Sequence, residues 1–464
     1  MAETTTPLVH EPSPGAFEPL MGEQRVQVLS RPSLSYWQDA WIRLKANRRA
    51  LISLYIVVGL LLFTVLGPVV WPVNPAAQDL DQISRPPLAD RSATLVDPYR
   101  PWEGDRSMMP AGSGLRLAEP ANSQAVRLLW DPLPGAHTYR VYRNIYPMAP
   151  GDALGLPMHE TLSPDILHFE DRLDLRPQSY YYTVVAVNEQ GDRLPARETL
   201  EVEVTRVITI DEALARGLVD VADQPQVGDA VKLALHPLGT DYLGRDMLSR
   251  LMHGARVSLF IGIVAPLLFV LFGVVYGSTA GFLGGRVDHA LMRFADFVIA
   301  LPFLLFMILF KIAFGIGPGE SGILPMVVAL VLLSWPGTAR LVRGQILQVR
   351  EEAYVSAARL LGARTNYLVL RHMIPNTMGV ILVTLTFAVP SAIFTEAFLS
   401  FIGMGVAPPT ASWGSMSNEG IKTMLTYPHE LIFPAVLISI TVLAFNLLGD
   451  GLRDALDAKM RSRE

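Results

Sequence analysis

The stretch REEAYVSAARLLGARTNYLVLRHMIPN, residues 350–376, is a polar interruption within the apolar C-terminal half of the chain. Two glutamates open it and arginines follow, which is the charge order that a helix dipole favours. We therefore predict a first helix that runs to about Leu361. Gly362 comes next and can turn left-handed without the roughly 1–2 kcal/mol penalty that a side chain imposes.

A second short helix is expected after this turn, and we predict that Pro375 ends it. On the first helix, Tyr354, Ala358 and Leu361 share one face at helical spacing. The small pair Ala357 and Ala358 would let another surface come close to the backbone. An amphipathic helix–turn–helix of this kind suits docking of a soluble partner, although it could equally be a connector that lies on lipid.

The composition indicates a polytopic membrane protein. Half of the 464 residues are hydrophobic, and the chain holds several apolar runs of about 20 residues. The net charge of −5 is too small to indicate a nucleic-acid partner, and zero Cys excludes disulfides, thiolate catalysis and Cys-ligated zinc. Six membrane spans are expected, at residues 50–70, 257–282, 290–314, 323–342, 378–398 and 431–448.

Basic residues predict the orientation of these spans, because Lys and Arg collect on the cytoplasmic side. They flank the start of the first span, residues 350–376 and the end of the last span, whereas the opposite short loops offer only Lys311 and Lys422. Both termini and residues 350–376 are then cytoplasmic, and the long loop after the first span is extracytoplasmic.

The chain is expected to divide into seven parts. They are a disordered cytoplasmic tail (1–32), an interfacial helix with the first span (33–71), an extracytoplasmic linker (72–114), a β-sandwich (115–206), an extracytoplasmic linker and lead-in (207–250), a five-helix membrane core (251–450) with polar helices at 350–375, and a cytoplasmic C-terminal tail (451–464).

The β-sandwich is predicted from short aromatic and β-branched runs separated by Pro, Gly and Asp turns. The region resembles a fibronectin type III domain, with Trp130 at the place of the early core tryptophan and Leu175, Pro177 and Tyr181 matching the tyrosine-corner pattern. Modules of this type bind or space rather than catalyse. The predicted core side chains are Val126, Leu128, Trp130, Tyr139, Val141, Tyr181, Val185 and Val187.

Residues 350–376 resemble the EAA loop of ABC-importer permeases, with Ala357, Ala358, Gly362 and Pro375 at the family's spacing. Ser356 stands where that motif usually has Glu. Three further stretches resemble the dipeptide, oligopeptide and nickel permease family. They are HPLGTDYLGRDMLSRLMHGARVSLFIG (236–262), EAFLSFIGMGVAPPTASWGSM (396–416) and AFNLLGDGLRDALDAKMR (444–461).

This resemblance implies a type I ABC importer permease that moves peptides or related small solutes by alternating access; nickel complexes are the alternative cargo. The implied partners are a second homologous permease, two cytoplasmic ATPases, an extracytoplasmic solute-binding protein and the bilayer. No catalytic, cofactor or metal residue is expected here, and ATP and Mg²⁺ would be bound by the partners. The implied ATPase-coupling residues are Tyr354, Ser356, Ala357, Ala358, Leu361, Gly362 and Pro375.

Charged residues near lipid need a partner, since an Asp at a helix centre costs about 2.5–3.5 kcal/mol on insertion scales. For Asp296 and Glu396 we favour structural hydrogen bonds over substrate contact. Candidates for the translocation path are Phe303, Phe306, Met307 and Glu396, although the three apolar side chains could equally belong to the core.

The lead-in at 236–262 has two interpretations. Its Asp and Arg residues predict either a turn-rich segment held by Asp–Arg pairs or, by resemblance, part of the outer face near the path. Two other protein classes also remain open. An ion-coupled transporter should show repeated halves and broken, charged spans, and an adhesion or sensor protein would leave residues 350–376 unexplained.

Overall fold

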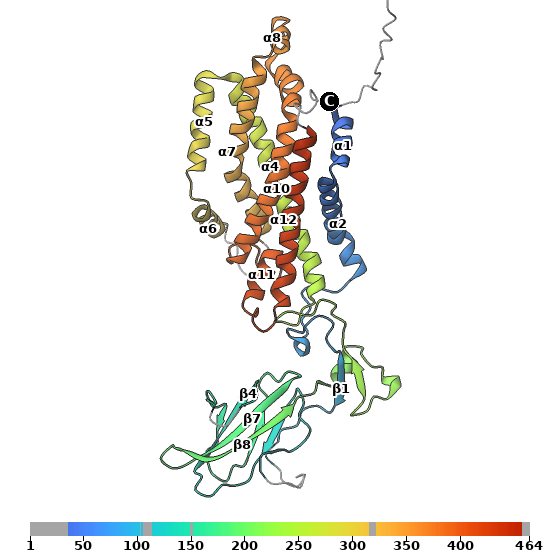
Figure 1. The fold of residues 1–464 in the computed structure, drawn as a ribbon, viewed down its shortest axis with the longest axis vertical. Coiled ribbons are helices and arrows are strands. Elements are labelled where there is room, and N and C mark those ends of the chain that lie inside the picture. The colour runs from blue at the N-terminus through green and yellow to red at the C-terminus, as the bar shows by residue number, and fades with distance from the viewer. Residues whose placement is uncertain (1–35, 103, 105–113, 149–151, 315–321, 457–464) are drawn as a thin grey trace, which may run out of the picture.

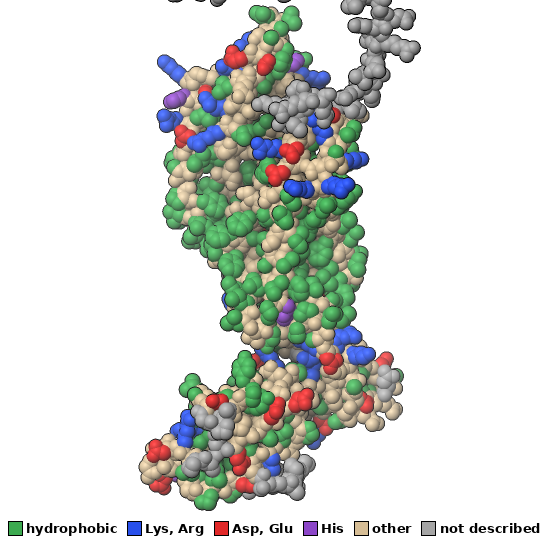
Figure 2. Space-filling view, in the orientation of Figure 1, with side chains coloured by type: hydrophobic (Ala, Val, Ile, Leu, Met, Phe, Trp, Pro, Cys, Tyr) green, Lys and Arg blue, Asp and Glu red, His purple; other side chains and the backbone are tan. Residues whose placement is uncertain are grey.

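The structure, a computed structural model, describes residues 36–102, 104, 114–148, 152–314 and 322–456. The predicted tail at 1–32 and residues 457–464 of the predicted C-terminal tail lie outside these ranges. The molecule is elongated, with a helical bundle at one end and β-strands at the other (Figure 1). Figure 2 shows a broad band of hydrophobic side chains across the visible face of the bundle, with Lys and Arg gathered beyond it toward the end opposite the strands.

Within the described residues, five helices are long and apolar enough to cross a membrane. Several extend past the predicted spans, because polar ends continue the helix beyond the apolar run. The five are α2 (Arg48–Val70), α4 (Met247–Leu283), α7 (Ile323–Arg350), α10 (Ile374–Phe401, continuous from Thr365) and α12 (His429–Leu456). Two shorter helices flank the bundle, α1 (Tyr36–Ala46) and α11 (Trp413–Ile421).

The predicted span at 290–314 is bent in the structure. The chain forms two helices there, α5 (Gly285–Ile299) and α6 (Phe303–Ala313), which meet at 81°. Pro302 is the N-cap of α6 and has extended backbone. A proline disfavours helical backbone in the residue before it and offers no N–H to the preceding turn, so the helix breaks at this point. The bent pair makes a sixth span if it is counted as one.

Glycines let α4 and α7 approach closely. Gly273, Gly277 and Gly281 are spaced four residues apart along α4, and a Cβ on Gly277 would lie only 2.3 Å from the Ala339 carbonyl oxygen. Small residues at this spacing allow helix backbones to come into contact in a membrane. The contact fixes α7, whose C-terminal end leads into residues 350–376.

Pro375 does not end a helix as predicted. Residues 365–401 form a continuous helical segment: α9 (Thr365–Tyr367), a π-helical segment (Leu368–Met373) and then α10. Pro375 lies in the first turn of α10. A proline is tolerated in that position, where its missing N–H matters least, and the wider π-helical turn precedes it.

The inserted β-strands form two sheets. One has the order β2 (Arg116–Leu117), β3 (Val126–Leu129) and β6 (His168–Asp171); the other has the order β5 (His159–Glu160), β4 (Thr138–Asn144), β7 (Ser179–Val187) and β8 (Arg193–Glu203). All pairings within them are antiparallel. Side chains from both sheets share one hydrophobic core that includes Val126, Trp130 and Val141. We call β2 to β8 the two-sheet region.

The predicted register of β7 was shifted by one residue. Tyr181 was expected in the core, but its hydroxyl donates to exposed Glu201, whereas Tyr180 and Tyr182 are buried. Tyr180 also occupies the corner, because its hydroxyl accepts from the Arg176 backbone N–H at 2.9 Å. Side chains alternate between the two faces of a strand, so a shift of one residue exchanges the faces. The core shared by the two sheets takes Val184 and Ala186. Val185 and Val187 are buried as predicted, with Val185 in a second cluster beside Tyr142 and Leu154.

A third, small sheet lies in the segments predicted as linkers. It has the order β10 (Ala230–Lys232), β1 (Ser92–Val96) and β9 (Val207–Thr209), and helix α3 (Ile210–Ala215) packs beside it. Ala93, Leu95 and Ile208 belong to its core. The chain entering the two-sheet region is thus hydrogen-bonded to the chain leaving it. The described parts of the two predicted linkers, 72–114 and 207–250, therefore contain a folded sheet.

Candidate functional site

Residues 351–364 form an exposed helical turn at the end of the bundle farthest from the strands. Its helix, α8 (Ala353–Leu360), projects beyond the other helices (Figure 1). One side chain, Val355, is fully buried and belongs to a cluster with Ile346 of α7 and Met373 before α10. The short helix is therefore anchored on one side and free on the other.

The turn after α8 has the predicted conformation. Gly362 has φ +84°, in the left-handed region. The N–H of Gly362 donates to the Arg359 carbonyl at 3.0 Å, and the N–H of Ala363 donates to the Ala358 carbonyl at 3.1 Å, which satisfies carbonyls at the helix end. A Cβ on Gly362 would meet no atom within 4 Å, so only the backbone conformation requires glycine here.

The free side of the turn is apolar. Leu360 and Leu361 are 90% and 89% exposed, and Ser356 and Ala357 are also exposed. Such a group of exposed large apolar side chains on a soluble face indicates a docking surface. The sequence prediction included Leu361 but missed Leu360; the adjacent Leu–Leu pair at the end of a short helix was the available signal.

Three contacts connect α8 to membrane helices. Asn376 Nδ2 of α10 donates to the Tyr354 hydroxyl at 2.8 Å. The Arg359 guanidinium lies 5.5 Å from the centre of the Phe282 ring of α4. Val355 supplies the third contact, to α7 and the start of α10. Burial raises the pKa of Tyr354, and the hydrogen bond that its oxygen accepts from Asn376 acts in the opposite direction. A displacement of α8 would therefore reach α4, α7 and α10 together.

The predicted coupling residues are only partly brought together. Tyr354, Ser356, Ala357, Leu361 and Gly362 lie on the exposed turn, and Ala358 is half-buried. Pro375 is exposed at the start of α10, beside Asn376. It belongs to the base of the turn rather than to its tip.

The candidates for the translocation path all face protein in this conformation. Met307 is buried in a cluster with Met326 and Leu330 of α7, and Phe303 and Phe306 pack against that cluster. Their place on a path stays a prediction.

The two charged residues predicted near lipid both have structural partners. Glu396 is fully buried and accepts hydrogen bonds from the Ser258 and Ser400 hydroxyls, each at 2.8 Å. Asp296 forms an ion pair with Arg340 of α7. The contacts of Glu396 and Asp296 are thus the structural ones that we favoured from the sequence.

The lead-in at 236–262 is held by Asp–Arg pairs at the opposite end of the bundle. The carboxylate of Asp241 lies 2.7 Å from Arg245 Nε and also pairs with Arg250. Glu419 of α11 pairs with both arginines, at 3.0 and 2.7 Å. Asp241 and Arg250 are only 2% and 3% exposed. This buried network ties α4 to α11. The alternative role near the path stays open.

A bundle of membrane-length helices with an anchored turn exposed at one end indicates a multi-pass membrane protein. Two family models match the sequence. "Binding-protein-dependent transport system inner membrane component" matches residues 273–462, and "N-terminal TM domain of oligopeptide transport permease C" matches residues 35–87.

Individual relatives agree with these matches. The chain is 48% identical over 240 residues to the oligopeptide transport system permease protein OppC of Bacillus subtilis (strain 168), covering 52% of this chain and 75% of the relative. It is 48% identical over 227 residues to the dipeptide transport system permease protein DppC of the same strain, covering 49% of this chain and 69% of the relative. A solved structure of the MetNI methionine ABC transporter matches with a TM-score of 0.38 and 16% identity, over 46% of this chain and 98% of that chain.

The chain belongs to the family of binding-protein-dependent transport permeases of ABC importers. It is a multi-pass inner-membrane transport subunit rather than an enzyme, and it works with ATPase and binding-protein partners. The secondary-transporter and adhesion alternatives are thereby set aside.

Proposed function

We propose that this permease imports short peptides. The observation that supports the coupling role is the exposed α8 turn, and the peptide class is supported by the named cargo of the relatives, which are oligopeptide and dipeptide permeases at 48% identity. Nickel complexes remain the alternative cargo from the sequence.

In the proposed assembly, this chain pairs with a second homologous permease, two cytoplasmic ATPases and an extracytoplasmic solute-binding protein. ATP and Mg²⁺ are bound by the ATPases. Closure of the ATPases displaces α8, and the contacts of Val355, Tyr354 and Arg359 carry that displacement into α7, α10 and α4. The transporter can respond only to the extent that the ATPases bind one of its two states more tightly.

Uptake by the reconstituted complex tests the cargo. Liposomes are prepared with both permeases and the ATPases, with ATP on the ATPase side of the membrane and the loaded binding protein on the opposite side. The labelled short peptide is expected to accumulate on the ATPase side. A Ni²⁺ chelate measured in the same vesicles is the comparison. Accumulation of the nickel complex without the peptide would replace the proposed cargo.

We further propose that both termini and α8 are cytoplasmic and that the inserted strands are extracytoplasmic. The Lys and Arg side chains gathered at the α8 end support this orientation (Figure 2). We propose also that the two-sheet region is a fibronectin type III-like sandwich over residues 115–206. Its support is the strand order β2-β3-β6 and β5-β4-β7-β8, the shared core and the Tyr180 corner.

Single cysteines can test both proposals, because the native chain has none. Ser356→Cys is expected to react with an impermeant thiol reagent only from the cytoplasm, and Gln190→Cys only from outside, since both positions are exposed. Ala186→Cys replaces a fully buried side chain of the two-sheet core and is expected to react only after denaturation. Reversed sidedness would refute the orientation, and rapid native labelling of position 186 would refute the packed sandwich.

A further inference from the structure

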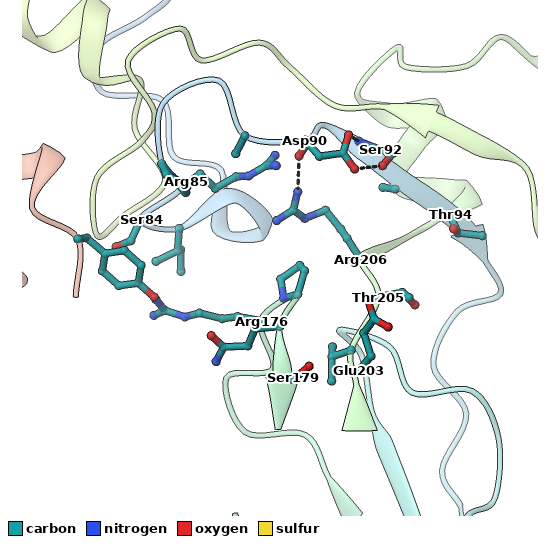
Figure 3. Close-up of a pocket in the computed structure, with 18 of the residues that line it drawn as sticks. Ser84, Arg85, Asp90, Ser92, Thr94, Arg176, Ser179, Glu203, Thr205 and Arg206 are labelled. Carbon is teal, nitrogen blue, oxygen red and sulfur yellow. Dashed lines mark hydrogen bonds between the residues drawn. The ribbon is translucent and has the colours of Figure 1, made fainter. Parts of the chain in front are cut away.

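An open cleft of about 760 Å³ lies where the two-sheet region meets the membrane unit (Figure 3). Its walls come from three places: the loop at 83–90 with the small sheet, the near ends of β7 and β8, and Tyr427 before α12. Small-molecule sites typically have volumes of roughly 300–1,000 Å³, so this cleft has room for a short peptide. None of the residues predicted from sequence to contact cargo lines it.

One wall of the cleft carries two guanidinium groups, those of Arg85 and Arg206 (Figure 3). Arg85 is only 8% exposed, and its Nη1 donates to the Gln82 side-chain oxygen at 2.7 Å. Arg206 Nη1 donates to the Asp90 backbone oxygen at 3.2 Å. Burial, followed by the charge of Arg206, lowers the pKa of Arg85 to about 10. The charges of Asp90 and Asp79 act in the opposite direction. A carboxylate placed between Arg85 and Arg206 would further reduce the repulsion between the two guanidinium groups.

The nearby Asp90 carboxylate is engaged by its own loop. It accepts the Ser92 backbone N–H at 3.1 Å and also the Ser92 hydroxyl. These hydrogen bonds lower the pKa of Asp90. The Asp90 carboxylate is thus hydrogen-bonded to Ser92, while its charge also acts on Arg85. A guanidinium carries five N–H donors, so Arg85 and Arg206 can each contact a ligand in addition to their present partners.

The cleft spans two parts of the chain that are far apart in sequence. Arg176, at the near end of the two-sheet region, donates to the Tyr427 hydroxyl, and its guanidinium lies 5.3 Å from the centre of that ring. Tyr427 precedes α12, and its ring contacts that of His429 at 6.5 Å. Glu203 also lines the cleft and supplies a carboxylate. The lining therefore offers guanidinium donors together with a separate acidic group.

We propose that this cleft binds a small zwitterionic solute such as a short peptide, with its carboxylate held between Arg85 and Arg206. Guanidinium groups suit carboxylates because they donate two parallel hydrogen bonds. Glu203 is then a partner for the ammonium group of the solute. The choice of a peptide rests on the proposed function, whereas the carboxylate site rests on the two arginines. The inserted domain would hold cargo at the outer mouth and not only space a partner from the membrane.

Binding to the purified full-length chain in lipid nanodiscs, without ATPases or binding protein, tests this site. Trialanine with a free C-terminal carboxylate is compared with its C-terminal amide by isothermal titration calorimetry. The acid form is expected to bind at least tenfold more tightly, since a charge-assisted hydrogen bond contributes about 1.5–3 kcal/mol. Arg206→Gln is expected to reduce the affinity for the acid to that for the amide. Arg140→Gln, on a different part of the two-sheet region, is the matched control and should keep full affinity.

Equal affinities of the wild-type chain for the acid and the amide would overturn the proposal. This comparison uses the wild-type chain alone, so it does not depend on the folding of a variant. Loss of binding equal in Arg206→Gln and Arg140→Gln would overturn it as well. The uptake assay of the reconstituted complex distinguishes a failure of the cleft proposal from a failure of the proposed peptide-import function. If the complex takes up the peptide but the chain alone does not bind it, the cleft proposal is refuted and the proposed importer function is retained. If the chain binds the acid form selectively but the complex does not take up the peptide, the carboxylate site is retained and the proposed cargo is refuted.

Discussion

Replacing Gly362 by valine is expected to abolish the stimulation of ATP hydrolysis by substrate-loaded binding protein, while the chain still inserts and assembles. Gly362 has φ +84°, a backbone conformation that costs an ordinary side chain about 1–2 kcal/mol and a β-branched one more. The turn would adopt another conformation and move Leu360 and Leu361 away from the ATPase. Hydrolysis by the reconstituted complex, with and without loaded binding protein, measures the effect.

Gly362→Asn is the matched control, because asparagine enters the left-handed region more readily than other residues with a side chain. It is expected to keep most of the stimulation. The position is open, with no atom within 4 Å of an added Cβ, so a steric clash cannot explain a difference between the two variants. Full stimulation in the valine variant would show that the left-handed turn is not needed for coupling.

The largest loss of stability is expected from Asp241→Ala. Its carboxylate accepts from the backbone N–H groups of Leu243 and Arg245, at 2.9 Å each, and pairs with the Arg245 and Arg250 side chains. Among the residues that the structure describes, its removal leaves Glu419 as the remaining ion-pair partner of the two buried guanidinium groups. Breaking a buried pair from one side costs about 3–5 kcal/mol. The thermal unfolding temperature and the yield of detergent-purified chain measure the loss.

Two comparisons make this prediction specific. Arg250→Gln in the same chain should restore part of the stability, since it removes one of the unbalanced charges. Glu160→Ala breaks an exposed pair with Arg140 and should cost less than about 1 kcal/mol. If Asp241→Ala unfolds at the wild-type temperature, the lead-in network does not hold α4 and α11 together.

The sequence pattern was sufficient for features that depend on local chemistry. Long apolar runs predicted the spans, because a helix is the way that a single segment can satisfy its backbone polar groups in lipid. Gly362 predicted the left-handed turn after α8, since no other residue adopts that backbone so readily. The four stretches that resemble the permease family predicted its family, and the two family models and the relatives confirm it.

Features that depend on which side chains meet were not predictable in the same way. The alternation in β7 is hidden by three consecutive tyrosines, 180–182, so the pattern allowed either register until the corner contact of Tyr180 and the packing of β4 decided it. The small sheet escaped prediction because β1, β9 and β10 have only three to five residues each and pair across more than a hundred positions.

The sequence by itself determined the membrane class, the family and the position of the turn at Gly362, because each follows from residues close together in the chain. Only the tertiary structure decided the pairing of the small sheet, the face of β7 that enters the shared core, and the cleft between Arg85, Arg206 and Tyr427. These depend on long-range contacts, whose energy is comparable to local preference and can override it. Two arginines separated by 120 residues come together only after the small sheet has joined the two ends of the insertion.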